Sequence, residues 1–204
     1  MAATLVIAIA CGAPDVAHAA LGSAPFRVAL MAAPVAAAAS DEAWAVLAKG
    51  GHVALVRHGN APPGYGDPPG FKIDDCATQR NMDERGRAQA RAVGEAFRQH
   101  GVIVDKILSS PWCRCLETAR LMALGPVENT WAVAASDRSP ERLVVLKQMV
   151  AGWRGPGTLV LVTHALTVQA LVGIMPDQAE TVVVKPKPGN EPGIDVVGRI
   201  AVPR

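Results

Sequence analysis

Short apolar runs alternate with segments of helical periodicity along most of the chain beyond residue 40. Three of these runs are too short for helices and rich in β-branched residues, which predicts buried strands over residues 52–56, 102–108 and 158–162. Apolar residues on one helical face predict helices over residues 41–48, 83–100, 140–153 and 165–172, and from residue 111 onward. Residues 129–133 are predicted to be extended, and residues 181–184 and 194–200 to form an edge hairpin.

Strands that alternate with helices are typical of an α/β fold. The predicted architecture is a three-layer α/β/α sandwich with a mostly parallel central sheet. Local signals mark helix ends: Asp83 is a predicted N-cap, Ser110 with Pro111 begins the next helix, and His100 is a C-terminal cap. A row of small residues predicts close packing of one helix on the sheet: Gly86, Ala90 and Gly94.

The first 39 residues differ from the rest of the chain in composition. A single arginine precedes an apolar run that ends in alanines, which is the form of a secretory signal peptide cleaved near Ala39 or near residues 17–19. A disordered, alanine-rich tail is the alternative. We therefore expect residues 1–39 to be a signal peptide or disordered segment and residues 40–204 to be one folded domain. Export, to the periplasm or out of the cell, is the localisation that a signal peptide implies.

Composition excludes several classes of function. The chain of 204 residues is half apolar, carries a net charge of +2 and has no basic stripe, so we expect no binding of nucleic acid. No apolar run has the length that a stable membrane span needs. Cys113 and Cys115 are too close in sequence for a zinc site. We expect Cys76 to pair with Cys113 or Cys115, and the alternative is three free thiols.

Cationic and ionisable side chains follow all three predicted central strands. Arg57 and His58 end the first strand, Arg114 lies in the helix after the second, and His164 ends the third. Ligands of parallel sheets bind at the carboxyl ends of the strands, so these residues are expected to meet. Two arginines brought together need an anion, and their planar donors suit a tetrahedral oxyanion. The pattern predicts a phosphate site.

The motifs around these residues resemble the histidine phosphatase superfamily, which has the phosphoglycerate mutase-like fold. They are Leu55-Val56-Arg57-His58-Gly59, Asp83-Glu84-Arg85-Gly86, Ser109-Ser110-Pro111-Trp112-Cys113-Arg114, and Leu161-Val162-Thr163-His164, in the order found in the family. The resemblance covers most of residues 50–172 and points to a compact member of branch 1.

The resemblance implies a role for each position. His58 is expected to be the nucleophile that forms a phosphohistidine, and Arg57, Arg114 and His164 are expected to hold the phosphoryl oxygens. Asn60 is a further candidate for phosphate binding, although it is equally well explained as a turn residue. No metal and no cofactor are expected, because the arginines supply the positive charge.

The general acid is less clearly marked. Asp137 follows Arg114 by 23 residues, a spacing similar to that in many relatives, and Glu128 and Glu141 are rivals. Another branch of the superfamily has an aspartate directly after the second histidine, where this chain has Ala165. We predict Asp137, with a plain helix N-cap as its alternative role.

The sequence therefore predicts an exported, metal-independent phosphatase that acts on a small phosphomonoester, or less readily on a phosphohistidine protein. A phosphoglycerate-type mutase is a weaker alternative, because only 50 positions separate Arg114 from His164. A phosphate-binding relative without catalysis is the other alternative. The substrate and the oligomeric state are not encoded in any readable motif.

Overall fold

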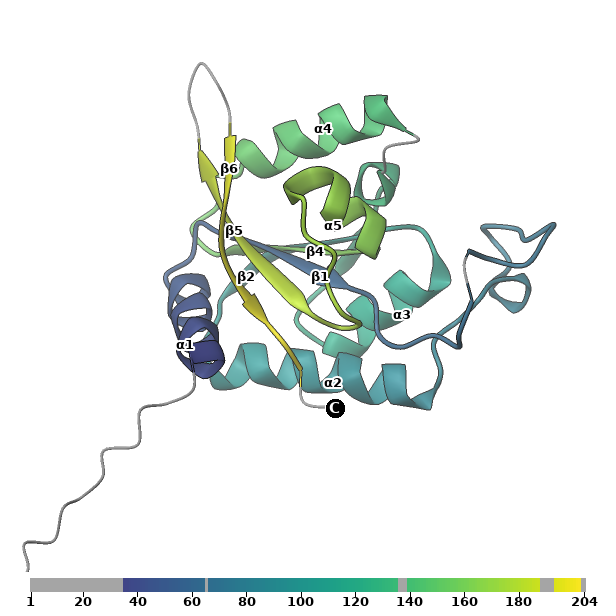
Figure 1. Cartoon of the computed structure of the whole chain (residues 1–204), viewed down its shortest axis with the longest axis horizontal. Helices are drawn as coiled ribbons and strands as arrows, with labels where there is room; N and C mark the ends of the chain where they lie inside the picture. Colours follow the sequence, from purple (N-terminus) through teal and green to yellow (C-terminus); the bar gives the residue numbers. More distant parts are fainter. Residues whose placement is uncertain (1–34, 65, 136–138, 188–192, 203–204) are drawn as a thin grey trace, which may run out of the picture. The chain divides into compact units, whose positions relative to one another are not determined.

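The computed structural model describes residues 35–64, 66–135, 139–187 and 193–202 (Figure 1). Within these ranges, none of the helices has the length and apolar character needed to cross a lipid bilayer. Helix α1 (Val35–Ala48) starts earlier than the predicted residue 41 and runs through the predicted cleavage position at Ala39. The predicted cleavage and the predicted division at residue 39 remain predictions.

The centre of the fold is a sheet whose order is β3-β2-β4-β1-β5-β6. Strands β1 to β4 pair in parallel, whereas β5 pairs antiparallel with β1 and β6. The hairpin of β5 and β6 thus forms one edge, as predicted. The strand bounds are β1 Val53–Arg57, β2 Val104–Ser109, β3 Val127–Asn129, β4 Thr158–Thr163, β5 Thr181–Lys187 and β6 Gly193–Ile200.

Alternating residues of the central strands face two separate hydrophobic cores. In β1, Ala54 and Val56 pack in a core shared with α1, α2 and α3, whereas Val53 and Leu55 pack in a second core with α4 and α5. Figure 1 shows the two groups of helices on opposite faces of the sheet. The remaining helix bounds are α2 Glu84–Gln99, α3 Cys113–Met122, α4 Pro140–Ala151 and α5 Ala165–Val172. The predicted three-layer α/β/α fold is confirmed.

The register of the parallel strands brings their carboxyl ends level. Arg57 at the end of β1 pairs with Thr163 at the end of β4, and Ser109 at the end of β2 pairs with Val162. The residues that follow these three strands therefore emerge at one edge of the sheet.

Helix α2 begins as predicted, because the Asp83 side chain accepts a hydrogen bond from the backbone N–H of Gly86. His100 is its C-cap, and the imidazole stacks on Trp44 with ring centroids 4.4 Å apart. The small-residue row is buried, but it packs on α3 and the loop after β1 and not on the sheet. A Cβ on Gly94 would lie 1.9 Å from the Met122 carbonyl oxygen.

Two further local predictions are wrong. Ser110 does not cap α3, which begins at Cys113 with Trp112 as N-cap, because the Ser110 hydroxyl is bonded to His164 instead. Residues 129–133 are not one extended segment. Strand β3 ends at Asn129, and the Thr130 hydroxyl then accepts a bond from the N–H of Ala132, which turns the chain into a 3-10 helix over Trp131–Ala134.

Candidate active site

A pocket of about 410 Å³ opens at the carboxyl ends of β1, β2 and β4. The strand ends and α3 supply its cationic and imidazole groups, the loop after β1 supplies a wall of prolines and glycines, and α5 supplies apolar side chains. Its lining residues include Arg57, His58, Pro62, Pro63, Gly64, Arg80, Arg114, His164, Leu166, Met175 and Gln178. Four of the predicted site residues, Arg57, His58, Arg114 and His164, therefore meet in one pocket.

The backbone of His58 is held by the last residue of β4 on one side and by the segment before β5 on the other. Its backbone N–H donates to the Thr163 carbonyl at 3.0 Å, and its own carbonyl accepts from the N–H of Ala179 at 3.2 Å. The ring nitrogen Nδ1 donates to the Gly59 carbonyl at 2.8 Å, because a carbonyl can only accept. This bond assigns the proton to Nδ1 and leaves a lone pair on Nε2.

Burial keeps the His58 imidazole neutral. Only 3% of the residue is exposed. Desolvation, followed by the charges of Arg114 and Arg57, lowers the pKa of His58 to about 3. The Nε2 atom is therefore unprotonated near neutral pH, as the predicted role of nucleophile requires.

His164 follows β4 and lies across the pocket from His58, with ring centroids 5.6 Å apart. Its Nδ1 faces a guanidinium nitrogen (NH2) of Arg114 at 3.5 Å, and its Nε2 lies 2.8 Å from the Ser110 hydroxyl. A guanidinium can only donate, so Nδ1 is the acceptor and Nε2 carries the proton. Burial, and then the charge of Arg114, lower the pKa of His164 well below its ordinary value.

Each of the two predicted arginines is held through its terminal nitrogen NH1. Arg57 donates from NH1 to the Pro176 carbonyl at 2.7 Å, and Arg114 forms an ion pair from NH1 to Asp67 at 2.8 Å. Among the described residues, the Nε atoms of both guanidinium groups are buried without a hydrogen-bond partner. One buried and one half-buried cation, each with an open donor, make the pocket suitable for an anion.

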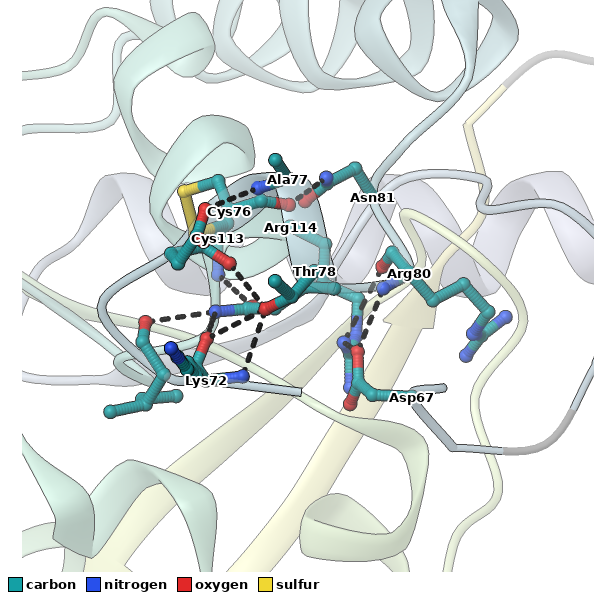
Figure 2. The surroundings of a disulfide bond; sticks show 12 residues. Asp67, Lys72, Cys76, Ala77, Thr78, Arg80, Asn81, Cys113 and Arg114 are labelled. Carbon is teal, nitrogen blue, oxygen red and sulfur yellow. Dashed lines mark hydrogen bonds and ion pairs between the residues drawn. A yellow bond between two sulfur atoms is a disulfide. The ribbon is translucent and has the colours of Figure 1, made fainter. Parts of the chain in front are cut away.

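Sequence reasoning missed two charged residues of the site. Asp67 comes from the proline- and glycine-rich loop after β1 and pairs with Arg114. Arg80 lines the pocket from the end of the same segment and donates from Nε to the Gly66 carbonyl at 2.9 Å. No periodicity or motif marks either residue, because both belong to an irregular loop. Figure 2 shows Asp67, Arg80 and Arg114 together beside the disulfide.

The disulfide joins Cys76 to Cys113, one of the two pairings that the sequence allowed. It ties the loop that carries Asp67 and Arg80 to the first residue of α3, immediately before Arg114 (Figure 2). Cys115 is free and buried, and burial raises the pKa of its thiol to about 12. That thiol is therefore not a reactive nucleophile.

Asn60 is not brought into the pocket. Its amide donates to the carboxylate of Asp83, and its backbone N–H donates to Gln89 at 2.9 Å, so the residue anchors the loop after β1 to the start of α2. This use of the side chain agrees with the turn-residue alternative.

The predicted general acid, Asp137, lies outside the described residues. Of its two rivals, Glu128 forms an ion pair with Lys106 at 2.9 Å, and Glu141 lies 3.9 Å from Arg142. Neither lines the pocket, and within the described ranges no carboxylate is among the lining residues.

A second cavity of about 340 Å³ shares Arg57 and Gln178 with the first. Its lining includes two acidic residues, Asp177 and Glu180. As for metals, no group of three or more His, Cys, Asp or Glu side chains able to hold an ion is found in the described part of the chain. The expectation of a metal-free site remains a prediction.

One protein-family model matches part of the chain. Residues 53–130, which contain Arg57, His58 and Arg114, match the family model of the histidine phosphatase superfamily (branch 1). This part of the chain is similar to branch 1 of the histidine phosphatase superfamily. His164 lies beyond the matched residues, and the pairing of β4 with β1 brings it near His58.

Solved structures share the histidine phosphatase fold at low sequence identity. The protein histidine phosphatase SixA in complex with tungstate is 14% identical, with a TM-score of 0.56 over 74% of this chain and 96% of that one. A product of an open reading frame of Mycobacterium tuberculosis is 15% identical, with a TM-score of 0.54 over 72% of this chain and 96% of that one. A mycobacterial glucosyl-3-phosphoglycerate phosphatase in complex with VO3 is 15% identical, with a TM-score of 0.51 over 71% of this chain and 96% of that one. A search of curated protein sequences found no match.

Proposed function

We propose that this protein is a phosphatase that hydrolyses a small phosphomonoester through a phosphohistidine on His58, without a metal. The observation that carries the proposal is a neutral, buried His58 whose Nε2 is free of protons and which shares a pocket with Arg57 and Arg114. Neutral imidazole is a competent nucleophile, and the arginines offset the charge of the phosphoryl oxygens. Two relatives with this fold bind tungstate or VO3, which resemble phosphate.

The proposed reaction has two steps. In the first, His58 Nε2 forms a bond to phosphorus while the bond from phosphorus to the ester oxygen breaks, and an acid protonates the leaving alcohol. In the second, water attacks phosphorus, its proton returns to the acid, and the bond from phosphorus to nitrogen breaks. Asp137 is our proposed acid. Inorganic phosphate and neutral His58 remain at the end.

Turnover of p-nitrophenyl phosphate by the purified domain tests the proposal. We expect activity in the wild type, loss of at least about 10³-fold in His58→Ala, and a smaller loss of about 10²-fold in Asp137→Asn. His52→Ala, a histidine outside the pocket, is the matched control and should keep full activity. A labelled, acid-labile and alkali-stable phosphoenzyme should form in the wild type and be absent in His58→Ala.

The same assay tests the assignment of the acid. If Asp137→Asn keeps the wild-type rate while Glu141→Gln or Glu128→Gln loses it, the acid is one of the rivals. Isomerisation of phosphoglycerate that depends on bisphosphoglycerate would instead identify a mutase.

A phosphate-binding protein without catalysis is the second candidate. The absence of a carboxylate among the described lining residues of the pocket favours it. Tight binding of inorganic phosphate by calorimetry, together with no turnover of phosphomonoesters from pH 4 to pH 8, would establish this candidate and overturn the first.

We also propose that the protein is exported. Disulfides persist mainly in oxidising compartments, so the bond between Cys76 and Cys113 supports export, as does the signal-like pattern of residues 1–39. Cell fractionation followed by N-terminal sequencing tests this. A mature N-terminus near residue 40 in the exported fraction is expected, and an unprocessed protein in the reducing cytosol would contradict the proposal.

A further inference from the structure

The loop after β1 sends one carboxylate into the wall of the active site. Asp67 is almost completely buried, with 5% of its side chain exposed, and its partner Arg114 is 7% exposed. The Asp67 oxygen Oδ1 accepts from Arg114 NH1 at 2.8 Å and from the backbone N–H of Arg80 at 2.9 Å. The other oxygen, Oδ2, accepts from the indole N–H of Trp112 at 2.9 Å. Three donors from three residues therefore fix one carboxylate.

The position of this carboxylate decides which way Arg114 faces. One terminal nitrogen of the guanidinium, NH1, is engaged by Asp67, while the other, NH2, faces Nδ1 of His164 at 3.5 Å. A planar guanidinium held at NH1 has little freedom to rotate, so NH2 stays directed toward the pocket. Asp67 also places a negative charge directly behind a cation of the anion site.

The surroundings of Asp67 are tied together by several independent links. Trp112 and Arg114, which both donate to Asp67, flank Cys113 in the sequence. Cys113 is bonded to Cys76, and its backbone N–H donates to the side chain of Gln79 at 3.0 Å. The segment from Asp67 to Arg80 is thus fastened to the start of α3, as Figure 2 shows around the disulfide. Such a fastening suits a residue whose function depends on its exact placement.

We propose that Asp67 is a positioning residue of the phosphatase site, which orients Arg114 for the transition state and limits the affinity of the pocket for phosphate. This rests on the proposed function. A carboxylate behind Arg114 repels a phosphate dianion and so favours product release. It is not placed to be the general acid, because it is not among the residues that line the pocket and its two oxygens already accept from three donors.

The decisive variant is Asp67→Asn, which keeps the size of the side chain but removes its charge. One amide oxygen cannot satisfy Trp112 and Arg80 together and also pair with Arg114, and an amide N–H toward Arg114 NH1 sets donor against donor. We expect kcat to fall by about tenfold or more, since Arg114 loses its orientation. We expect the affinity for inorganic phosphate to rise by about threefold or more, since the repelling charge is gone.

Opposite movement of kcat and phosphate affinity is the signature of this role, and loss of folding does not produce it. Asp67→Glu restores the charge on a longer side chain, so the phosphate affinity should return to within about twofold of the wild type while kcat stays low. Glu117→Gln is the matched control. Glu117 lies on α3 and pairs with Arg87 at 2.7 Å outside the pocket, and its loss should leave both quantities unchanged.

Three results overturn the proposal. They are an unchanged kcat in Asp67→Asn, a kcat that falls together with the phosphate affinity, and an equal response in Glu117→Gln. If the wild type hydrolyses no phosphomonoester, the proposed function fails separately. Calorimetry with inorganic phosphate then still decides the role of Asp67, because a phosphate affinity that does not rise in Asp67→Asn overturns it.

Discussion

At the scale of single residues, the chemistry of the site depends on what lies behind each reactive side chain. Nε2 of His58 is unprotonated because Nδ1 keeps its proton and donates it in a hydrogen bond to the Gly59 carbonyl, and because burial beside arginines keeps the ring neutral. The tautomer of His164 is fixed in the same way, by Ser110 beside Nε2 and by Arg114 beside Nδ1. The hydrogen-bond partners of each imidazole ring therefore determine which of its nitrogens carries the proton.

Ser110 should act on catalysis through His164. In Ser110→Ala the Nε2 proton of His164 loses its partner at 2.8 Å, and the ring is free to rotate or change tautomer. We expect kcat/KM to fall by about tenfold, while thermal unfolding shifts by only a few degrees. Steady-state kinetics and calorimetry measure the two quantities.

Ser109→Ala is the control for this prediction. The Ser109 hydroxyl is buried like that of Ser110, but it donates to the Ser110 carbonyl at 2.9 Å and not to a histidine. Equal losses of kcat/KM in the two variants would show that His164 does not need its serine partner.

At the scale of elements, the positions of the active-site residues follow from regular strands and from one irregular segment. The strand ends were predictable, because apolar β-branched runs mark β1, β2 and β4 and because parallel strands present their carboxyl ends together. The segment from residue 61 to residue 80 was not predictable. Its conformation depends on contacts far away in sequence, such as Asp67 with Trp112 and Arg114.

The same distinction explains the errors at Ser110 and Asn60. A serine before a proline is a good helix N-cap by local rules, but Ser110 meets His164, which lies 54 positions away. The Asn60 amide likewise meets Asp83, 23 positions away. Local propensity predicts elements well and fails where a side chain has a stronger distant partner. Asp137 remains a prediction, since it lies outside the described residues.

Reduction of the disulfide should weaken both the fold and the site. The bond closes a loop with a sequence separation of 37, for which chain-entropy arguments give a stabilisation of about 4 kcal/mol. We expect the free energy of unfolding, measured with urea, to fall by about that amount in reductant. We also expect kcat/KM to fall, since the loop that carries Asp67 and Arg80 is released from α3.

The variant with both Cys76→Ala and Cys113→Ala is the control. It should match the reduced wild type and should not respond to reductant. A wild-type enzyme that keeps its full kcat/KM after complete reduction would contradict the role of the disulfide in the site.

At the scale of the whole domain, the buried histidines couple stability to pH. The pKa of His58 is about 3 in the folded protein and near 6.5 in the unfolded chain, so the unfolded state binds more protons between these values. The stabilising contribution is therefore complete above about pH 6.5 and is lost as the pH falls toward 3. Each pH unit in this window costs up to about 1.4 kcal/mol for each such histidine.

Urea unfolding at intervals from pH 8 to pH 5 measures this coupling. The free energy of unfolding should fall below about pH 6.5 in the wild type, and the fall should be shallower in His58→Gln, which has no titrating group at that position. Identical slopes in the two proteins would mean that His58 titrates alike when folded and unfolded, and would contradict its burial as a neutral ring.

The order of the strands also bears on how a nascent chain acquires its site. Strand β1 and strand β2 are not neighbours, because β4, which is made much later, lies between them. A ribosome that has reached only the end of α4 has already produced His58 and both arginines, yet the space between β1 and β2 is empty and His164 does not exist. The pocket can therefore be complete only after β4 has been made, and a translation product that ends before β4 has the early motifs without it.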